Sequence, residues 1–189
     1  MISFYDVFMI PLERRGIRKA RKELIQKATG HVLEIGSGTG VNLKHYNFDR
    51  IESLTVTDKK LSKKIKKIAP NIVKLDEHNV TDLPYEDDTF DCIVHTLVFC
   101  SVADVDKGLE EIKRILKPDG RLLFIEHILP EGKKTNKLFR FVNPVWTTFA
   151  SGCSLIKDYE SSLQTNGFDI AFSKKFMNTV FVYGEAKKH

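Results

Sequence analysis

The stretch of this chain best suited to holding a ligand is Val-Leu-Glu-Ile-Gly-Ser-Gly-Thr-Gly at residues 32–40. Its apolar residues predict a short buried strand, and Gly36, Gly38 and Gly40 predict a tight turn directly after it. A strand that ends in such a turn lets a nucleotide-like ligand approach the backbone. The glycines are spaced G-x-G-x-G, whereas the dinucleotide pattern G-x-G-x-x-G requires glycine at Val41. The spacing therefore argues against a nicotinamide dinucleotide.

An acidic residue stands where it could hold a ribose. Asp58 ends the next β-branched run, 18 positions after Gly40 (58 − 40). Ligands of open parallel sheets lie beyond the carboxyl ends of the strands, so this carboxylate and the glycine turn are expected at one edge. It could accept hydrogen bonds from both ribose hydroxyls, or it could cap the helix that follows. The nearby glycine turn favours the ribose role.

A third segment indicates which class of nucleotide-like ligand the glycine turn binds. Residues 79–91 read Asn-Val-Thr-Asp-Leu-Pro-Tyr-Glu-Asp-Asp-Thr-Phe-Asp. Together with the glycine turn and Asp58, they resemble the class I S-adenosylmethionine (SAM) dependent methyltransferases, over residues 30–127. The resemblance implies that SAM is the cofactor and that the backbone at Val80 lies against adenine. Asn79 stands where the family carries an acid, and its side-chain carbonyl can still accept a hydrogen bond from the adenine amino group.

The resemblance also implies which residues hold the cofactor. The glycine turn and Asp58 would bind the carboxypropyl and ribose parts, and the backbone at His95 would contact the methionine part. The expected cofactor-binding residues are Glu34, Gly36, Ser37, Gly38, Gly40, Asp58, Lys59, Asn79, Val80 and His95.

Segments downstream carry a narrower resemblance. Residues 95–102, 124–128, 143–146 and 152–155 look like parts of the small alkyl-thiol methyltransferases. Bacterial phospholipid N-methyltransferases share some of these segments, and quinone C-methyltransferases resemble the first half of the chain. The resemblance implies methyl transfer to a small-molecule acceptor, with a thiol as the first expectation and a quinone or a phospholipid as alternatives. A non-catalytic SAM-binding module that regulates a partner is the alternative from another class.

Candidate catalytic residues lie at the carboxyl end of the predicted strand at 121–126. Because the sulfonium of SAM is already an activated donor, the protein mainly has to place the acceptor and exclude water. Glu126 and His127 are the best polar groups to face the methyl, and a histidine of pKa ~6.5 could take a proton from a thiol or phenol. Alternatively, both residues cap the strand. Tyr5 and Trp146 are the expected substrate-binding residues.

Strands and helices must alternate to position these groups. We predict strands at 32–35, 54–57, 72–75, 90–95 and 121–126, and a helix at 104–116. Runs at 168–172 and 180–184 predict a closing antiparallel hairpin. The expected fold is α/β: a doubly wound, mostly parallel seven-stranded sheet of the Rossmann-like methyltransferase type, with helices on both faces and an antiparallel last strand.

The length of 189 residues fits a single domain, residues 1–189. Residues 1–29 are expected to form an N-terminal helical cover, an aromatic patch followed by a basic amphipathic helix. Residues 131–160 interrupt the alternation and carry several aromatic side chains. We expect this insertion to form a lid over the substrate, although a core role for the aromatic residues is the alternative.

The charge and the cysteine content of the chain indicate which binding partners and which cellular location to expect. The net charge is +5, and lysines between residues 59 and 67 supply much of the excess. They lack interleaved aromatic residues, which favours a solvated helix face over nucleic-acid binding. The three cysteines have no metal-type spacing and are odd in number, so we expect no metal and a cytoplasmic location. We expect no signal peptide and no transmembrane segment, although the N-terminal patch could touch a membrane surface.

Overall fold

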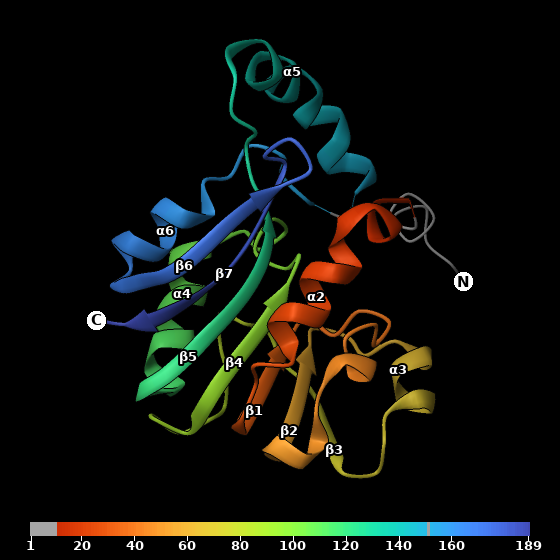
Figure 1. The fold of residues 1–189 in the computed structure, drawn as a ribbon, viewed down its shortest axis with the longest axis vertical. Coiled ribbons are helices and arrows are strands. Elements are labelled where there is room, and N and C mark those ends of the chain that lie inside the picture. Colours follow the sequence, from red (N-terminus) through yellow and green to blue (C-terminus); the bar gives the residue numbers. More distant parts are fainter. Residues whose placement is uncertain (1–10, 151) are drawn as a thin grey trace.

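The computed structural model describes residues 11–150 and 152–189, which form a seven-stranded sheet with helices on both faces (Figure 1). The strand order is β3-β2-β1-β4-β5-β7-β6. Strands β1 to β5 pair in parallel, whereas β7 runs antiparallel to both β5 and β6. The predicted fold class is confirmed. The strands are β1 (Gly30–Ile35), β2 (Ile51–Asp58), β3 (Val73–Glu77), β4 (Phe90–Thr96), β5 (Leu116–His127), β6 (Phe168–Phe176) and β7 (Phe181–Lys188).

Helices cover the sheet from both sides. Helices α2 and α3 pack on one face, and α4 and α6 pack on the other (Figure 1). The described helices are η1 (Glu13–Ile17), α2 (Arg18–Ile25), η2 (Leu43–His45), η3 (Phe48–Arg50), α3 (Lys63–Ile68), α4 (Val105–Ile115), α5 (Lys133–Phe149) and α6 (Tyr159–Thr165). None of the helices in residues 11–150 and 152–189 is long and apolar enough to cross a membrane.

The two-sided burial explains why the central strands read as continuous apolar runs. Successive residues of a strand point to opposite faces, so both faces of a covered strand must be apolar. In β1, Val32 packs in the core under α2, and Leu33 packs in the core under α4. Helix α2 is the basic amphipathic helix predicted near the N-terminus. Its apolar side chains Ala20, Leu24 and Ile25 are buried against the sheet.

Strand β5 begins directly after α4, five residues earlier than the predicted strand at 121–126. Leu116 pairs with Phe90, and regular pairing resumes with Arg121 opposite Cys92. Residues 117–120 therefore bulge out of the ladder, which is how the Lys-Pro-Asp-Gly sequence is accommodated within β5. At the other end of α4, the side chain of Asp104 caps the helix by accepting a hydrogen bond from the amide of Lys107 at 3.0 Å.

Of the two segments expected to cover the site, the structure describes all but one residue of 131–160 and only part of 1–29. The N-terminal aromatic patch, with Tyr5, lies outside the described residues. The segment 131–160 contains α5, which lies across the end of the sheet where β4 and β5 finish (Figure 1). Its role as a lid stays a prediction.

The glycine turn after β1 is packed against the loop after β4. Gly36 has a φ of +76°, and a Cβ atom built there would lie 2.2 Å from Cγ2 of Val98. Gly38 also has a positive φ, +49°, but a Cβ atom there would meet nothing within 4 Å. Glycine at 36 is therefore required by both packing and backbone conformation, whereas glycine at 38 is required by backbone conformation alone.

This difference predicts unequal costs for two matched substitutions. We expect G38A to lower the free energy of unfolding by about 1–2 kcal/mol, the cost of a left-handed alanine. We expect G36A to cost about 3 kcal/mol or more, because the added methyl group must also displace Val98. Urea denaturation of both variants measures the difference, and equal losses would contradict the packing argument.

Candidate active site

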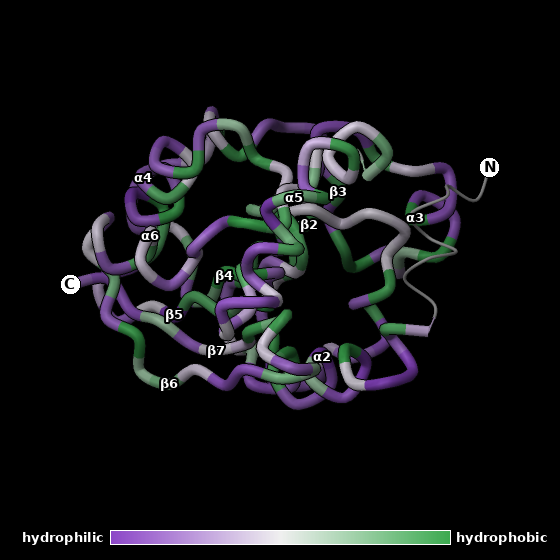
Figure 2. Tube along the Cα trace, turned by 90° about the horizontal axis from the view of Figure 1, so that it is seen from above, coloured by the Kyte–Doolittle hydropathy of each residue, from purple (hydrophilic) through white to green (hydrophobic). Residues whose placement is uncertain are grey.

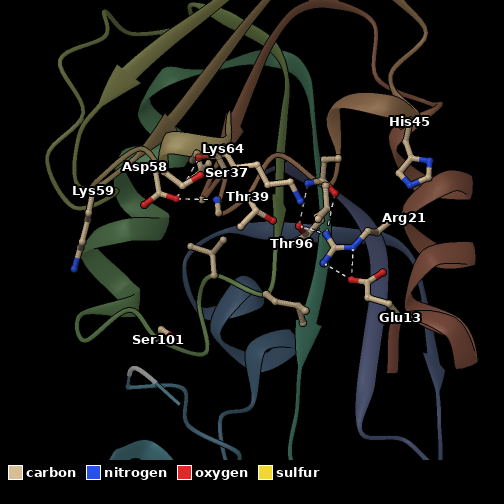
Figure 3. A pocket seen from close by; sticks show the side chains of 18 of the residues that line it. Glu13, Arg21, Ser37, Thr39, His45, Asp58, Lys59, Lys64, Thr96 and Ser101 are labelled. Atoms are coloured by element: carbon tan, nitrogen blue, oxygen red, sulfur yellow. Dashed lines mark hydrogen bonds and ion pairs between the residues drawn. The ribbon is translucent and has the colours of Figure 1, made fainter. Parts of the chain in front are cut away.

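A pocket of about 1080 Å³ opens at the carboxyl ends of β1, β2 and β4 (Figure 3). This is the edge at which open α/β sheets bind their ligands. Six of the predicted cofactor-binding residues line it: Gly36, Ser37, Gly38, Asp58, Lys59 and Val80. Because a Cβ atom at Gly38 would meet only open space, the turn leaves room for a ligand at the backbone.

Asp58 is held in a fixed orientation beside the glycine turn. Its Oδ2 accepts hydrogen bonds from the amide of Gly38 at 3.0 Å and from Oγ of Ser37 at 3.3 Å (Figure 3). The carboxylate stands at the end of β2 and lines the pocket. A ligand placed against the turn would therefore meet a preoriented carboxylate.

Two predicted cofactor-binding residues, Gly40 and Asn79, lie behind the pocket wall and do not line the pocket. A Cβ atom at Gly40 would meet Ile65 of α3 at 3.1 Å, so this glycine allows the turn to pack on that helix. Oδ1 of Asn79 accepts from the amide of Thr81 at 3.4 Å within a local turn. Asn79 is not among the pocket-lining residues, so the expected contact with adenine does not match this geometry, although its neighbours in sequence do line the pocket.

Glu34 lies beneath the pocket and is fully buried. Its Oε1 accepts from Nδ2 of Asn42 at 3.0 Å, and its Oε2 accepts from the hydroxyl of Tyr46 at 2.7 Å. Burial raises the pKa of Glu34 to about 7. Both oxygens are used internally, so Glu34 braces the segment after the glycine turn, and the expected direct contact with cofactor is not what the structure supports.

An arginine that the sequence analysis did not single out joins this network. Arg21 of α2 is buried on the pocket wall, and its Nη1 donates to Oδ1 of Asn42 at 2.8 Å and to Oγ1 of Thr96 (Figure 3). Its Nε and Nη2 lie 3.0 and 2.9 Å from Oε1 of Glu13. Asn42 and Thr96 are distant from Arg21 in the sequence, so no local sequence motif predicts these hydrogen bonds.

The carboxylate of Glu126 is occupied by the loop after β4. Its Oε1 accepts hydrogen bonds from the amides of Val98 and Phe99, at 2.8 and 2.9 Å, and lies 2.9 Å from Nδ1 of His95. Its Oε2 accepts from the amide of Cys100 at 3.2 Å. Glu126 is fully buried and does not line the pocket. The expectation that it faces the methyl group is corrected: it holds a loop.

The loop that Glu126 holds forms a wall of the pocket. Leu97, Val98 and Ser101 line the pocket, and Leu97 has a φ of +60°, an uncommon conformation for a residue other than glycine. Nζ of Lys157 donates to the carbonyl oxygen of Phe99 at 2.8 Å. The loop is therefore held by a carboxylate on its amides and by an ammonium group on a carbonyl.

His95 belongs to the same buried network. The side chain lies between Glu126 and Tyr159, with Nε2 2.6 Å from the tyrosine hydroxyl. It points into the core under α6 rather than into the pocket, whose wall is formed by the next residue, Thr96. The side chain of His95 is therefore structural, and the expected contact between its backbone and the methionine part of the cofactor stays a prediction.

The remaining described candidates are His127, at the end of β5, and Trp146, on α5. The ring of His127 stacks on Phe139, with centroids 6.1 Å apart, and meets the edge of Phe181 at 5.3 Å. Burial lowers the pKa of His127 to about 4, and its Nδ1 has no hydrogen-bond partner among the described residues. Trp146 packs on a buried cluster formed by Cys100, in the loop after β4, and by Ala150 and Cys153, just after α5. Neither side chain lines the pocket, so the structure does not bring them to the cofactor residues.

The pocket carries an excess of positive charge. Seven lysine and arginine residues line it, against two acidic residues, Glu13 and Asp58. Such a surplus raises the local concentration of anions and stabilises ionised forms of acidic ligands. The basic lining residues are Arg14, Arg18, Arg21, Lys44, Lys59, Lys63 and Lys64.

Comparison with solved structures agrees with this architecture. A SAM-dependent methyltransferase from Aquifex aeolicus superposes with a TM-score of 0.69 at 18% identity, covering 98% of this chain and 97% of that one. The methyltransferase CalH in complex with SAH superposes with a TM-score of 0.66 at 16% identity, covering 92% and 55%. At these identities the comparison shows the fold.

Sequence comparison identifies the family. Residues 33–124 match the family described as "Methyltransferase domain". The chain is 32% identical to thiol S-methyltransferase TMT1B of Rattus norvegicus, over 82% of this chain and 71% of that protein. It is 32% identical to the demethylmenaquinone methyltransferase of Thermotoga maritima, over 71% and 61%.

A third relative shares a shorter region. The yeast protein "Methyltransferase OMS1, mitochondrial" is 34% identical over 58% of this chain, and the match spans 28% of the yeast protein. The chain belongs to the SAM-dependent methyltransferase family, with SAM as its cofactor.

Proposed function

We propose that this enzyme transfers the methyl group of SAM to the sulfur of a small-molecule thiol. The observation that carries the proposal is the match to a thiol S-methyltransferase over most of both chains. The positive surplus in the pocket supports it, because cations favour the thiolate, which is the nucleophilic form of a thiol.

The lining of the pocket fits the cofactor. The glycine turn offers open space at Gly38, and the adjacent carboxylate of Asp58 has the chemistry to accept from two ribose hydroxyls. Val80 also lines the pocket and supplies an apolar surface of the kind that an adenine ring requires. We assign the ribose to Asp58 and the ring to the Val80 side.

We propose that the protein acts mainly through placement and charge. The bound cofactor supplies a methyl group already activated on a sulfonium. The residues of this chain orient the acceptor, exclude water and hold its sulfur ionised. His127 has a pKa near 4 and lies behind Phe139, which makes it a poor proton acceptor at neutral pH. We assign no general base, and we propose that segment 131–160 covers the acceptor.

Quinone C-methylation is the second candidate. The match to the Thermotoga maritima enzyme covers 71% of this chain at the same identity as the thiol relative. Methylation at carbon requires a phenolate, which the same cations could also stabilise. The two candidate functions are distinguished experimentally by which acceptor, a thiol or a hydroquinone, is methylated.

We further propose a small molecule, rather than a nucleic acid, as the acceptor and a cytoplasmic location. The three cysteines of the chain are free and buried thiols, as a reducing compartment would maintain them. Fractionation of cells that express the tagged chain tests the location. Recovery of the chain with mitochondria would contradict it.

The first prediction concerns the acceptor. Purified enzyme supplied with SAM should release S-adenosylhomocysteine with a small alkyl thiol about tenfold faster or more than with a hydroquinone or with phosphatidylethanolamine vesicles. The rate should rise with pH and level off below the solution pKa of the thiol, because the pocket cations favour the thiolate. Turnover with hydroquinone alone would replace the thiol proposal. Tight SAM binding without turnover on any acceptor would indicate a regulatory module.

The second prediction concerns Asp58. Calorimetric titration with SAM should show a Kd about 10- to 100-fold higher for Asp58→Asn than for wild type, because hydrogen bonds to a charged acceptor are lost. Asp119→Asn, at the opposite end of the sheet, is the matched control and should bind normally. Equal affinities in all three proteins would refute the ribose assignment.

The third prediction concerns Glu126 as a positioning residue. In Glu126→Gln one carboxylate oxygen is replaced by an NH2 group, which cannot accept a hydrogen bond from the backbone amides of the loop. The loop should therefore shift, and SAM binding should weaken about tenfold. Ile115→Ala removes buried volume from the far end of α4 and should cost about 2–5 kcal/mol of stability without changing the Kd. Calorimetry and urea denaturation of both variants separate the two effects. If both variants lost stability and neither lost affinity, Glu126 would be merely structural.

A further inference from the structure

Helix α5 carries an apolar face that the rest of the described protein leaves uncovered. Leu138, Phe141, Val145 and Phe149 are 57%, 82%, 64% and 68% exposed. Their spacing of three and four residues places them on one side of the helix. They are four of the seven large apolar side chains exposed in the described residues. Exposure concentrated in this way marks an interaction surface.

The opposite side of α5 is fixed to the body of the protein. Phe139 stacks on His127, and Oδ1 of Asn143 accepts a hydrogen bond from the amide of Leu155 at 2.7 Å. Trp146 packs on the buried cysteine cluster. The helix is therefore docked along one side, and its apolar outer face is presented to the surroundings by the fold.

The charge of α5 indicates what this face would contact. The helix has four basic residues and no acidic residue among its 17 positions. The basic side chains are exposed and lie in the first half of the helix. Lys134 and Lys137 stand four residues before Leu138 and Phe141 respectively, which places these two lysines beside the apolar face. The four basic residues are Lys133, Lys134, Lys137 and Arg140.

We propose that α5 docks on the surface of an anionic lipid bilayer. The apolar face would lie among the headgroups and the first acyl carbons, and the basic residues would contact lipid phosphates. Interfacial helices combine these two features, an exposed apolar face and a basic polar flank. Each basic residue near an anionic surface adds attraction that salt weakens.

The place of α5 in the fold gives the docking a consequence for the pocket. The helix lies beyond the carboxyl ends of β4 and β5, at the end of the sheet that holds the glycine turn (Figure 1). Seen from above, it crosses the middle of the molecule (Figure 2). A bilayer bound by α5 would face the pocket end of the protein. The proposal does not depend on which acceptor is methylated.

Vesicle co-sedimentation of the full chain tests the proposal without any turnover. Wild type should bind vesicles of phosphatidylcholine mixed with phosphatidylglycerol, should bind phosphatidylcholine alone weakly, and should release at high salt. F141S/F149S should bind the mixed vesicles about tenfold or more weakly, because two large apolar groups are lost. Ile72→Ser, at a side chain 64% exposed on another part of the surface, is the matched control and should bind like wild type.

A second pair of variants tests the charges. Lys133→Gln/Lys137→Gln should weaken binding to the mixed vesicles by about fivefold for each lysine removed. Lys174→Gln/Lys187→Gln removes the same charge from the β6–β7 hairpin and should bind like wild type. Equal binding by wild type and F141S/F149S would overturn the proposal. So would the absence of vesicle binding together with a wild-type dimer that F141S/F149S converts to a monomer, which would assign the face to a second copy of the chain.

Discussion

The pocket depends on a buried carboxylate that holds a backbone loop in an unfavourable conformation. A carboxylate without a partner is costly to bury, and Glu126 is accommodated because three backbone N–H groups donate to it and Nδ1 of His95 lies within hydrogen-bond distance. The same loop is held from its carbonyl side by Lys157. Opposite charges on the two sides of one loop fix Leu97 at positive φ and place Val98 against Gly36. The cofactor turn and the loop after β4 are thus built as one unit.

A second network supports the pocket from the other face of the sheet. Glu34, Asn42 and Arg21 connect the end of β1 to α2, and Thr96 joins them to the end of β4. Polar groups behind the lining residues restrict their rotamers, which is the usual means of preorganising a binding site. Each network reaches the pocket from a different helical layer, so the sheet edge is held from both sides.

The sequence was sufficient for the fold and for the residues at strand ends, because a parallel sheet collects its carboxyl ends at one edge. The strand periodicity, the glycine turn and Asp58 follow from local patterns. The side chains of Glu126, His95 and Asn79 could not be placed from such patterns, because their partners depend on how distant loops pack. The place of Glu126 at the end of a strand marks it as chemically important, but a strand pattern does not say whether a buried carboxylate faces a ligand or backbone amides.

Long-range contacts account for what the sequence did not show at all. Arg21 lies 75 residues from Thr96, and no spacing rule connects them. The outward face of α5 is likewise not predictable from the sequence, because aromatic residues at helical spacing are consistent with a core, a lid or an exposed face. In the structure Phe139 and Trp146 turn inward, whereas Phe141 and Phe149 turn outward.

A crystal structure with S-adenosylhomocysteine tests the central claim, that this pocket holds the cofactor between the glycine turn and the loop fixed by Glu126. The account predicts the two ribose hydroxyls within hydrogen-bond distance of Asp58, the adenine ring on the Val80 side, and the hydrogen bonds of Glu126 unchanged. A ligand bound elsewhere, or a ribose without contact to Asp58, would contradict it.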